Sequence, residues 1–247
     1  MNIAVAGGTG TLGRHVVTIA QARGHRVVSL SRAEGVDLVS GAGLAEALKG
    51  VDAVIDVANI QTLNGKKSVD FFTAVSGNLL RAEKVAGVGH HVALSIVGVD
   101  RAPVGYYAGK LAQEDVVRNG GVPWTILRAT QFHEFAPQML ERSSLGPLVL
   151  VPRMASQPVA AHEVAAALID AAEAGPQGRA ADLGGPERKQ MAHLVRAYAR
   201  KHGQKKRVIE FTAPGRLWRA MRNGSLIPAA GAAVGRQTFG EWLETDP

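Results

Sequence analysis

A tyrosine and a lysine stand four residues apart, at Tyr106 and Lys110. Residues at this spacing share one face of a helix, so a phenol and an ammonium group can converge on one site. The ordinary pKa of a phenol is about 10, and a neighbouring cation is expected to lower the pKa of Tyr106 toward the range that is useful for proton transfer. Ser95 lies at the end of the strand predicted before this helix, where its hydroxyl is expected to hold a substrate carbonyl oxygen.

A second tyrosine leaves the catalytic assignment open. Tyr107 follows Tyr106 directly and stands three residues before Lys110, so it can take the catalytic place while Tyr106 packs, or it can contact the substrate. The predicted catalytic set is therefore Ser95, Tyr106 and Lys110, with Tyr107 as a substrate contact or as a replacement for Tyr106.

The elements that must position these residues alternate along the first half of the chain. Short runs rich in β-branched residues predict strands at Asn2–Ala6, Arg26–Leu30, Ala53–Asp56, His91–Ile96 and Trp124–Arg128. Longer Ala- and Leu-rich segments predict helices at Thr11–Ala22, Leu44–Lys49, Ser68–Ala86, Tyr107–Asn119, His162–Ala174 and Lys189–His202. This alternation predicts an α/β fold of the Rossmann type, a doubly wound parallel sheet.

Past residue 130 the alternation weakens and Pro and Gly become frequent. We therefore expect a dinucleotide-binding core at residues 1–130 and a smaller substrate-side lobe at residues 131–247, interwoven with the core as one structural domain. The pair His90–His91, just before a predicted strand, is expected to lie on the surface.

A glycine-rich stretch, residues 7–13 (GGTGTLG), lies between the first predicted strand and the first predicted helix. Glycines in this position let backbone N–H groups approach a pyrophosphate, and the helix N-terminus adds partial positive charge. We expect cofactor contacts from Gly7, Thr9, Gly10, Thr11, Leu12 and Gly13. The spacing Gly7-x-x-Gly10-x-x-Gly13 resembles that of the short-chain dehydrogenase/reductase superfamily.

The end of the second predicted strand reads Ser31-Arg32, at the place where an NAD enzyme usually carries an acidic residue. A guanidinium can pair with a ribose 2′-phosphate, so we expect NADP(H) to be preferred, with NAD(H) as the alternative. The superfamily resemblance implies that Asp37 faces the adenine amino group.

Several longer segments resemble one group within this superfamily, the NmrA-like NAD(P)-binding proteins, which are atypical short-chain reductases with an extended-type substrate lobe. The resemblance is carried by residues 106–114 (YYAGKLAQE), 123–135 (PWTILRATQFHEF), 157–160 (QPVA), 184–187 (GGPE) and 240–243 (GEWL). It implies that the loop bearing Thr130, Gln131 and Phe132 lies by the nicotinamide, and that Ala58 and Asn59 line the cofactor cleft. His133, in the same loop, either touches the substrate or bonds to the backbone.

The chain departs from conventional short-chain enzymes after the predicted strand Ala53–Asp56, where Val57-Ala58-Asn59-Ile60 replaces the usual Asn-Asn-Ala-Gly. NmrA-like proteins include active reductases and redox-sensing regulators that bind the cofactor without turning it over. The presence of Tyr106 favours an enzyme, because a phenol can transfer a proton. We expect an NADPH-dependent oxidoreductase that reduces a small carbonyl, quinone or activated alkene, with Lys110 binding the ribose hydroxyls; a regulator is the alternative.

Composition limits the other classes of function. The chain has 247 residues, 46% of them hydrophobic and 20% charged, and no cysteine, which excludes disulfides and cysteine nucleophiles. His133-Glu134 and His162-Glu163 each lack the second histidine of a zinc-protease motif, so we expect no metal. Without an apolar run long enough to span a bilayer or a basic leader, we expect a cytoplasmic protein that does not enter a membrane.

The net charge of +7 is concentrated in one segment. Residues 188–236 hold 12 basic side chains and one acidic side chain. A solvated face is the interpretation we favour, because no nucleic-acid motif accompanies the charge and few aromatic residues are present for stacking on bases. We therefore expect a small-molecule substrate and no nucleic acid, while the oligomeric state stays open.

Overall fold

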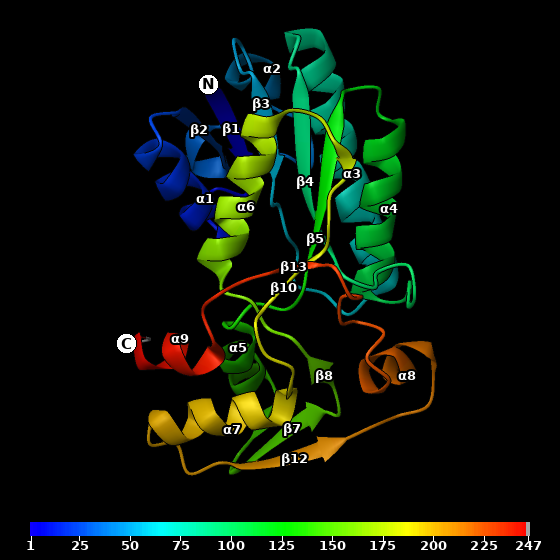
Figure 1. Ribbon diagram of the computed structural model, residues 1–247. Coiled ribbons are helices and arrows are strands. Elements are labelled where there is room, and N and C mark those ends of the chain that lie inside the picture. Colours follow the sequence, from blue (N-terminus) through cyan, green and yellow to red (C-terminus); the bar gives the residue numbers. More distant parts are fainter. Residues whose placement is uncertain (246–247) are drawn as a thin grey trace. The chain divides into compact units, whose positions relative to one another are not determined.

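The computed structural model describes residues 1–245, which form two compact units (Figure 1). Unit 1 comprises residues 1–128 and 162–181, and unit 2 comprises residues 129–161 and those from 182 onward. The weakening alternation past residue 130 predicts a smaller lobe over all of residues 131–247. In the structure residues 162–181 belong to unit 1, where Arg23 forms salt bridges with Asp170 at 2.7 Å and Glu173 at 2.8 Å.

Unit 1 is built on a sheet in the strand order β2-β1-β3-β4-β5. Its strands are β1 (Asn2–Ala6), β2 (Arg26–Leu30), β3 (Ala53–Asp56), β4 (His90–Ile96) and β5 (Trp124–Ala129), and β9 (Gly178–Arg179) pairs in parallel with β5. The pairs β1–β2, β1–β3 and β3–β4 are parallel. This is the sheet expected from the sequence, and the predicted Rossmann-type fold is confirmed.

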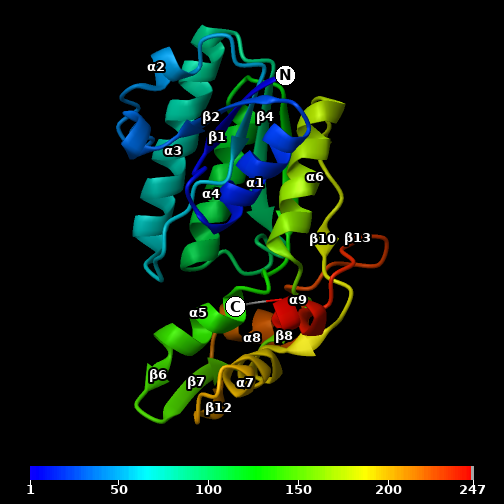
Figure 2. The ribbon, with the colours of Figure 1, turned by 90° about the vertical axis from the view of Figure 1, so that its left-hand side faces the viewer.

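Helices cover both faces of this sheet. Unit 1 contains α1 (Thr11–Ala22), α2 (Leu44–Ala47), α3 (Gly65–Ala86), α4 (Tyr106–Asn119) and α6 (Ala161–Ala174), and a 3₁₀ turn, η1 (Arg32–Glu34). Figure 2 shows α3 and α4 on one side of the sheet and α1 and α6 on the other. Because both faces are covered, every residue of β3 is buried, which explains why its sequence shows no alternation of polar and apolar residues.

The helix that carries Tyr106 and Lys110 packs closely against α3. A Cβ atom added at Gly109 of α4 would lie 2.5 Å from the backbone carbon of Ser68 in α3, so only glycine fits. The Ser68 hydroxyl also donates a hydrogen bond of 3.0 Å to the backbone carbonyl of Tyr106. These contacts fix the first turn of α4 against α3.

Two histidines at the start of β4 lie inside unit 1, which corrects the expectation that they are on the surface. His91 is 0% exposed and contacts both carboxylate oxygens of Glu83, at 2.8 and 3.0 Å. Burial lowers the pKa of His91, but the Glu83 carboxylate outweighs burial and the pKa is raised. His90 contacts the Thr125 hydroxyl at 2.9 Å.

Unit 2 contains short strands and the remaining helices. The strands are β6 (Ser144–Leu145), β7 (Leu148–Pro152), β8 (Ala155–Ser156), β10 (Leu183–Gly184), β11 (Lys189–Gln190), β12 (Arg207–Phe211) and β13 (Ala233–Val234). The helices are α5 (Phe135–Arg142), α7 (Met191–Lys201), α8 (Arg216–Arg222) and α9 (Phe239–Thr245). β7 pairs antiparallel with β6 and parallel with β12, and β8 pairs with β11.

Within residues 1–245, no helix has both the length and the apolar character that crossing a membrane requires.

Candidate functional site

The glycine-rich stretch predicted to bind a pyrophosphate forms the turn between β1 and α1. A Cβ atom at Gly13 would lie 2.0 Å from the carbonyl oxygen of Gly7, so the turn closes only with glycine there. Gly10 immediately precedes α1 and has no side chain to cap it. Backbone N–H groups in the first turn of a helix have no partner within the helix and can bind an anion. The loop therefore fits a pyrophosphate.

The loops after β1 and β3 meet at the point where the sheet order reverses. Gly7 has a positive φ of 82°, and a Cβ atom there would lie 2.9 Å from the carbonyl oxygen of Val57 and 3.0 Å from the backbone of Ala58. In open α/β sheets, ligands bind at such a switch point, at the carboxyl ends of the strands. The structure thus brings the predicted residues Gly7 and Ala58 together at this edge.

Ser31 and Arg32 follow β2 at the same edge of the sheet. The Oγ atom of Ser31 is buried and has no hydrogen-bond partner in the described part of the chain, and Arg32 is exposed next to it. A buried hydroxyl without a partner costs free energy unless a ligand completes it. Asp37 accepts a hydrogen bond of 2.9 Å from the backbone N–H of Val39, which lowers the pKa of Asp37.

Tyr106 opens α4, and its hydroxyl donates a hydrogen bond of 2.7 Å to Oδ1 of Asn59. Asn59 follows Ala58, so this bond connects the start of α4 to the loop that contacts Gly7. The rings of Tyr106 and Tyr107 meet edge to face with centroids 6.3 Å apart. Burial raises the pKa of Tyr106, and Tyr107 raises it further.

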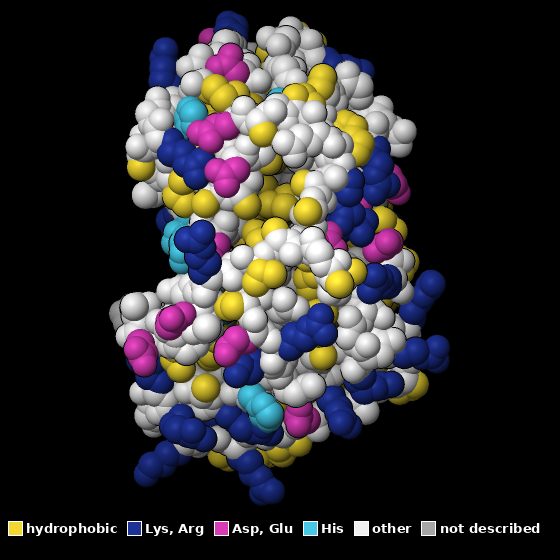
Figure 3. Space-filling model, in the orientation of Figure 1, with side chains coloured by type: hydrophobic (Ala, Val, Ile, Leu, Met, Phe, Trp, Pro, Cys, Tyr) yellow, Lys and Arg dark blue, Asp and Glu magenta, His cyan; other side chains and the backbone are white. Residues whose placement is uncertain are grey.

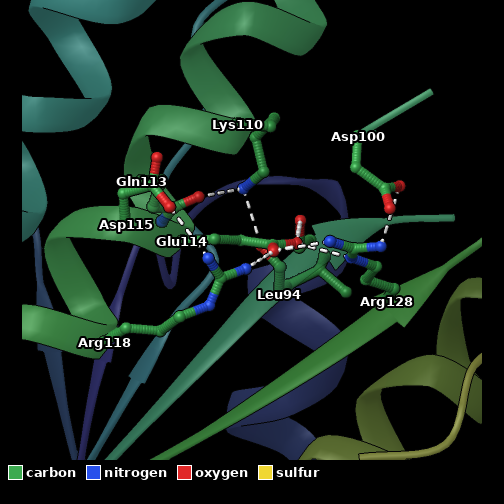
Figure 4. Close-up of polar contacts among 9 residues, drawn as sticks. Leu94, Asp100, Lys110, Gln113, Glu114, Asp115, Arg118 and Arg128 are labelled. Atoms are coloured by element: carbon green, nitrogen blue, oxygen red, sulfur yellow. Dashed lines mark hydrogen bonds and ion pairs between the residues drawn. The ribbon is translucent and has the colours of Figure 1, made fainter. Parts of the chain in front are cut away.

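Lys110 is buried and directs its ammonium group into the interior of unit 1 (Figure 4). Its Nζ atom donates a hydrogen bond of 2.6 Å to the carbonyl oxygen of Leu94 and another to Oε1 of Gln113. Nζ also lies 4.6 Å from the centroid of the Phe72 ring. Burial lowers the pKa of Lys110 to about 8, although the carboxylates of Asp56 and Glu114 act in the opposite direction.

The expectation that Lys110 lowers the pKa of Tyr106 is wrong, since that pKa is raised. The physical reason is the position of the ammonium group. The Lys110 ammonium group donates hydrogen bonds to the Leu94 carbonyl of β4 and to Gln113 of its own helix. The Phe72 ring contacts both Lys110 and Tyr106, and its centroid lies 5.7 Å from that of the Tyr106 ring. The two residues share a helix face, as the spacing predicts, but their hydrogen-bond partners differ: Tyr106 bonds to Asn59, and Lys110 bonds to Leu94 and Gln113.

Ser95 lies in a buried polar cluster with Glu114 and Arg128. Figure 4 shows the Glu114 and Arg128 side chains of this cluster. Its Oγ atom donates a hydrogen bond of 2.5 Å to Oε1 of Glu114. Arg128 binds the same carboxylate with Nε at 2.6 Å and Nη2 at 2.7 Å, and reaches Asp100 at 3.0 Å. Burial opposes ionisation of Glu114, but these hydrogen bonds outweigh it and lower the pKa of Glu114.

Asp56 also belongs to the candidate site, although it is not among the residues expected from the sequence. It is 0% exposed at the end of β3; Oδ1 accepts a hydrogen bond of 3.0 Å from the N–H of Ala58, and Oδ2 accepts one of 2.8 Å from Gln113. Because Gln113 also accepts from Lys110, Asp56 links α4 to the loop after β3. The available signal was a lone carboxylate closing an apolar strand, three residues before Asn59.

The residues expected beside the nicotinamide belong to unit 2. Thr130 donates a hydrogen bond of 2.6 Å from its hydroxyl to the carbonyl of Gln157, and Phe132 pairs with Val159. Both polar atoms of the Gln131 amide are buried without a partner among residues 1–245. The site roles of these residues stay predictions.

His133 is buried among aromatic rings of unit 2. Its ring centroid lies 5.6 Å from that of Phe239 and 5.7 Å from that of Trp242, and Nε2 contacts the backbone carbonyl of Gln237 at 3.1 Å. His133 is 1% exposed, so the structure favours the alternative in which His133 bonds to the backbone over the one in which it touches the substrate.

A family model described as NAD(P)H-binding matches residues 7–175. The chain belongs to this NAD(P)H-binding family. One relative, the (4-alkanoyl-5-oxo-2,5-dihydrofuran-3-yl)methyl phosphate reductase of Streptomyces griseus, is 32% identical over 224 residues, which cover 80% of this chain and 74% of that protein. Another, the photosystem II assembly factor Ycf39 of Synechocystis, is 30% identical over 195 residues, 69% of this chain and 59% of that protein.

Solved structures share the fold of this NAD(P)H-binding protein. The quinone oxidoreductase QOR2 of Escherichia coli, complexed with NADPH, superposes with a TM-score of 0.74 at 19% identity and covers 98% of both chains. MoeE5 in complex with UDP-glucuronic acid and NAD gives a TM-score of 0.73 at 18% identity, covering 99% of this chain and 97% of that one. The fold is thus found with either dinucleotide.

Proposed function

We propose that this protein is an NADPH-dependent reductase of a small carbonyl, quinone or activated alkene. The observation that carries the proposal is the hydrogen bond from the Tyr106 hydroxyl to Asn59, which holds this phenol against the loop that contacts Gly7. The names of relatives point the same way, since one is a reductase of an oxo-dihydrofuran phosphate and another, at 24% identity, is a quinone oxidoreductase.

The preference for NADPH rests on the end of β2. A 2′-phosphate beside Ser31 and Arg32 would receive a charge-assisted hydrogen bond from the guanidinium and would complete the buried Ser31 hydroxyl. NADH has a hydroxyl at that position, so its contact with Ser31 and Arg32 would be weaker and would contribute less to binding. We therefore assign Gly7, Gly10 and Gly13 to the pyrophosphate, and Ser31 and Arg32 to the ribose phosphate.

NADPH, when bound, supplies a hydride to the acceptor carbon, and the acceptor oxygen needs a proton in the same reaction. Tyr106 is protonated at neutral pH, as a phenol ordinarily is, so its hydroxyl has a proton to give. The transfer requires the hydrogen bond to Asn59 to break and works against the raised pKa of Tyr106. In this step the Tyr106 O–H bond breaks and the substrate O–H bond forms. The phenolate that results takes a proton from solvent before the next turnover.

Asn59 and Lys110 position the reacting groups in this proposal. The amide of Asn59 holds the Tyr106 hydroxyl and has N–H hydrogens that can orient an acceptor oxygen. Lys110 gives two of its three hydrogens to Leu94 and Gln113 and lies over the Phe72 ring, so its ammonium group must turn outward to bind a ribose hydroxyl. Ser95 donates its hydrogen to Glu114, so it must break that bond to orient a substrate.

The test is NADPH oxidation by the purified protein across a panel of quinones, aldehydes and enones. We expect substrate-dependent oxidation that is slower with NADH. If NADPH binds tightly but none of the panel is reduced, the reductase assignment fails.

A second candidate function is a redox-sensing regulator that binds the cofactor without turning it over. It is favoured by the raised pKa of Tyr106 and by the assembly-factor relative. This alternative requires a partner protein whose affinity differs between NADP+ and NADPH. Partner binding that is the same with either form would exclude it.

A further inference from the structure

The small sheet of unit 2 formed by β6, β7 and β12 buries one of its faces. Alternate side chains of a strand point to opposite faces, and Val149, Val151 and Val208 point to the same one. Val149 and Val151 are 0% exposed and Val208 is 8% exposed, and α7 contacts both β7 and β12. This face therefore belongs to the core of unit 2.

The opposite face carries large hydrophobic side chains that remain accessible. The strand register places Leu145 beside Leu148, and Leu150 beside Ile209. Leu145 is 65% exposed, Ile209 36% and Phe211 38%. The Phe211 ring packs against Trp218, with centroids 5.2 Å apart. We call this surface the apolar face; it consists of Leu145, Leu148, Leu150, Ile209, Phe211 and Trp218.

Basic side chains border the apolar face along β12. This basic border consists of Arg207, which shares its face of β12 with Ile209 and Phe211, and of Lys205 and Lys206 just before that strand. Arg196 and Arg200 belong to α7, which covers the opposite face. Lys206 donates a hydrogen bond of 2.7 Å to the carbonyl of Gly146, so this basic border adjoins the turn that carries Leu145. Figure 3 shows Lys and Arg side chains gathered in the region of α7 and β12.

The charge of this region decides what kind of partner it fits. Lys205, Lys206 and Arg207 stand together beside the apolar face, in a segment whose residues 188–236 hold 12 basic side chains and one acidic side chain, so two copies of the same surface would repel each other. Nucleic acid matches the charge, but most of the apolar face is aliphatic, and its two aromatic rings, Phe211 and Trp218, pack against each other. An anionic phospholipid surface matches both properties: its headgroups attract Lys and Arg, and its headgroup–acyl boundary accepts Leu, Phe and Trp.

We propose that unit 2 docks on anionic phospholipid membranes through the apolar face, with the basic border lying on the headgroups. The association is peripheral and reversible, because it combines a few inserted side chains with electrostatic attraction. It does not depend on the reductase function proposed above.

Vesicle flotation of the full chain tests this proposal. We expect the protein to float with phosphatidylcholine vesicles that contain about one third phosphatidylglycerol, and not with phosphatidylcholine alone. Raising the salt to about 1 M, where the screening length is about 3 Å, should release most of the bound protein.

Two double variants separate the parts of the surface. Leu145→Ser with Phe211→Ser removes the most accessible apolar groups, and Lys205→Glu with Arg207→Glu reverses part of the basic border. Each should lower the bound fraction about tenfold or more. The matched control is Val85→Ser with Lys49→Glu in unit 1, where Val85 is 86% exposed; it should bind like the wild type. Unchanged NADPH affinity and circular dichroism would show that each variant is folded.

Three outcomes overturn the proposal. The first is failure to float with the anionic vesicles. The second is flotation that the Leu145 and Phe211 variant does not reduce, which would show that charge alone drives binding and that the apolar face takes no part. The third is tight binding to duplex DNA, lost in the Lys205 and Arg207 variant, without vesicle binding; this would identify nucleic acid as the partner.

Discussion

Ser95 donates a hydrogen bond of 2.5 Å to Oε1 of Glu114 inside unit 1. Arg128 binds the same carboxylate through two nitrogens, so Ser95 is part of a buried ion-pair cluster between β4, α4 and β5. A serine hydroxyl has one hydrogen to donate, and here Glu114 takes it. Ser95 therefore has two possible roles, stabilising the fold through Glu114 or orienting a substrate, and experiments can distinguish them.

Ser95→Ala is expected to lower stability more than activity. Removing one of the hydrogen bonds to the buried Glu114 carboxylate should reduce the free energy of unfolding by about 1–3 kcal/mol. The kcat for NADPH oxidation should change little, because the hydroxyl is committed to Glu114. Urea unfolding and steady-state kinetics check both parts. A large fall in kcat at unchanged stability would instead restore Ser95 as a substrate-orienting residue.

Tyr106→Phe is expected to lower kcat about 100-fold or more, because it removes the proton donor. Tyr107→Phe is the matched control, since it removes a hydroxyl from the adjacent ring; its kcat should stay close to that of the wild type. Steady-state oxidation of NADPH with the best acceptor of the panel measures both. If the two variants have equal activity, the catalytic assignment of Tyr106 is wrong.

Arg32→Ala is expected to weaken NADPH binding about 10- to 100-fold through the loss of a charge-assisted hydrogen bond to the 2′-phosphate. Binding of NADH, which has no phosphate there, should be nearly unaffected. Titration calorimetry with both cofactors gives the ratio. Arg26→Ala, at the exposed start of β2, is the control and should leave the ratio unchanged. Equal losses for NADPH and NADH would contradict the assignment.

Gly13→Ala is expected to abolish NADPH binding or to weaken it more than about 100-fold, since the added Cβ atom would lie 2.0 Å from the Gly7 carbonyl and would open the turn. Gly77→Ala in α3 adds the same atom at a distance of 3.4 Å from an arginine side chain and should bind NADPH normally. Fluorescence titration measures the affinities, and thermal unfolding shows whether each variant is folded. Normal NADPH binding by a folded Gly13→Ala protein would exclude the pyrophosphate role of this loop.

Lys110 should make stability depend on pH in the alkaline range. The ordinary pKa of a lysine is 10.5 and that of Lys110 in the folded protein is about 8, so between these values the unfolded chain binds more protons. The free energy of unfolding should therefore rise with pH across this window, by about 3 kcal/mol from this residue. The difference between wild type and Lys110→Met, from urea unfolding at several pH values, isolates the contribution. A difference that stays constant from pH 7 to 10 would show that Lys110 titrates normally; Lys49→Met, at an exposed site, is the reference.

The strands and the first helix of unit 1 could be predicted because their signals are local. Glycine-bounded apolar runs gave the bounds of β1, β2, β3 and α1 as the structure has them. The two-residue strands of unit 2 could not be predicted, because their pairing is decided by neighbours far along the chain, as between Leu183 and Ala233.

The candidate site shows the same division between local and distant information. Spacing correctly placed Tyr106 and Lys110 on one helix, and the glycines at the turn after β1. The hydrogen-bond partners of these side chains could not be predicted. Lys110 bonds to Leu94 and Gln113, and His91 is buried in unit 1 and contacts Glu83. Each of these contacts depends on which helix covers which strand, and nothing in the local sequence specifies that.

The discontinuity of unit 1 has a consequence for biosynthesis. The ribosome completes residues 1–128 early, but α6 and β9 follow only after residues 129–161. Until then the edge of β5 lacks β9, and the apolar side of α6, with Val164, Leu168 and Ile169, has not been made. A nascent chain at this stage exposes an open strand edge, a feature that promotes aggregation. Unit 1 is thus expected to reach its native state only once residue 181 has emerged, so a fragment ending near residue 130 should depend on chaperones.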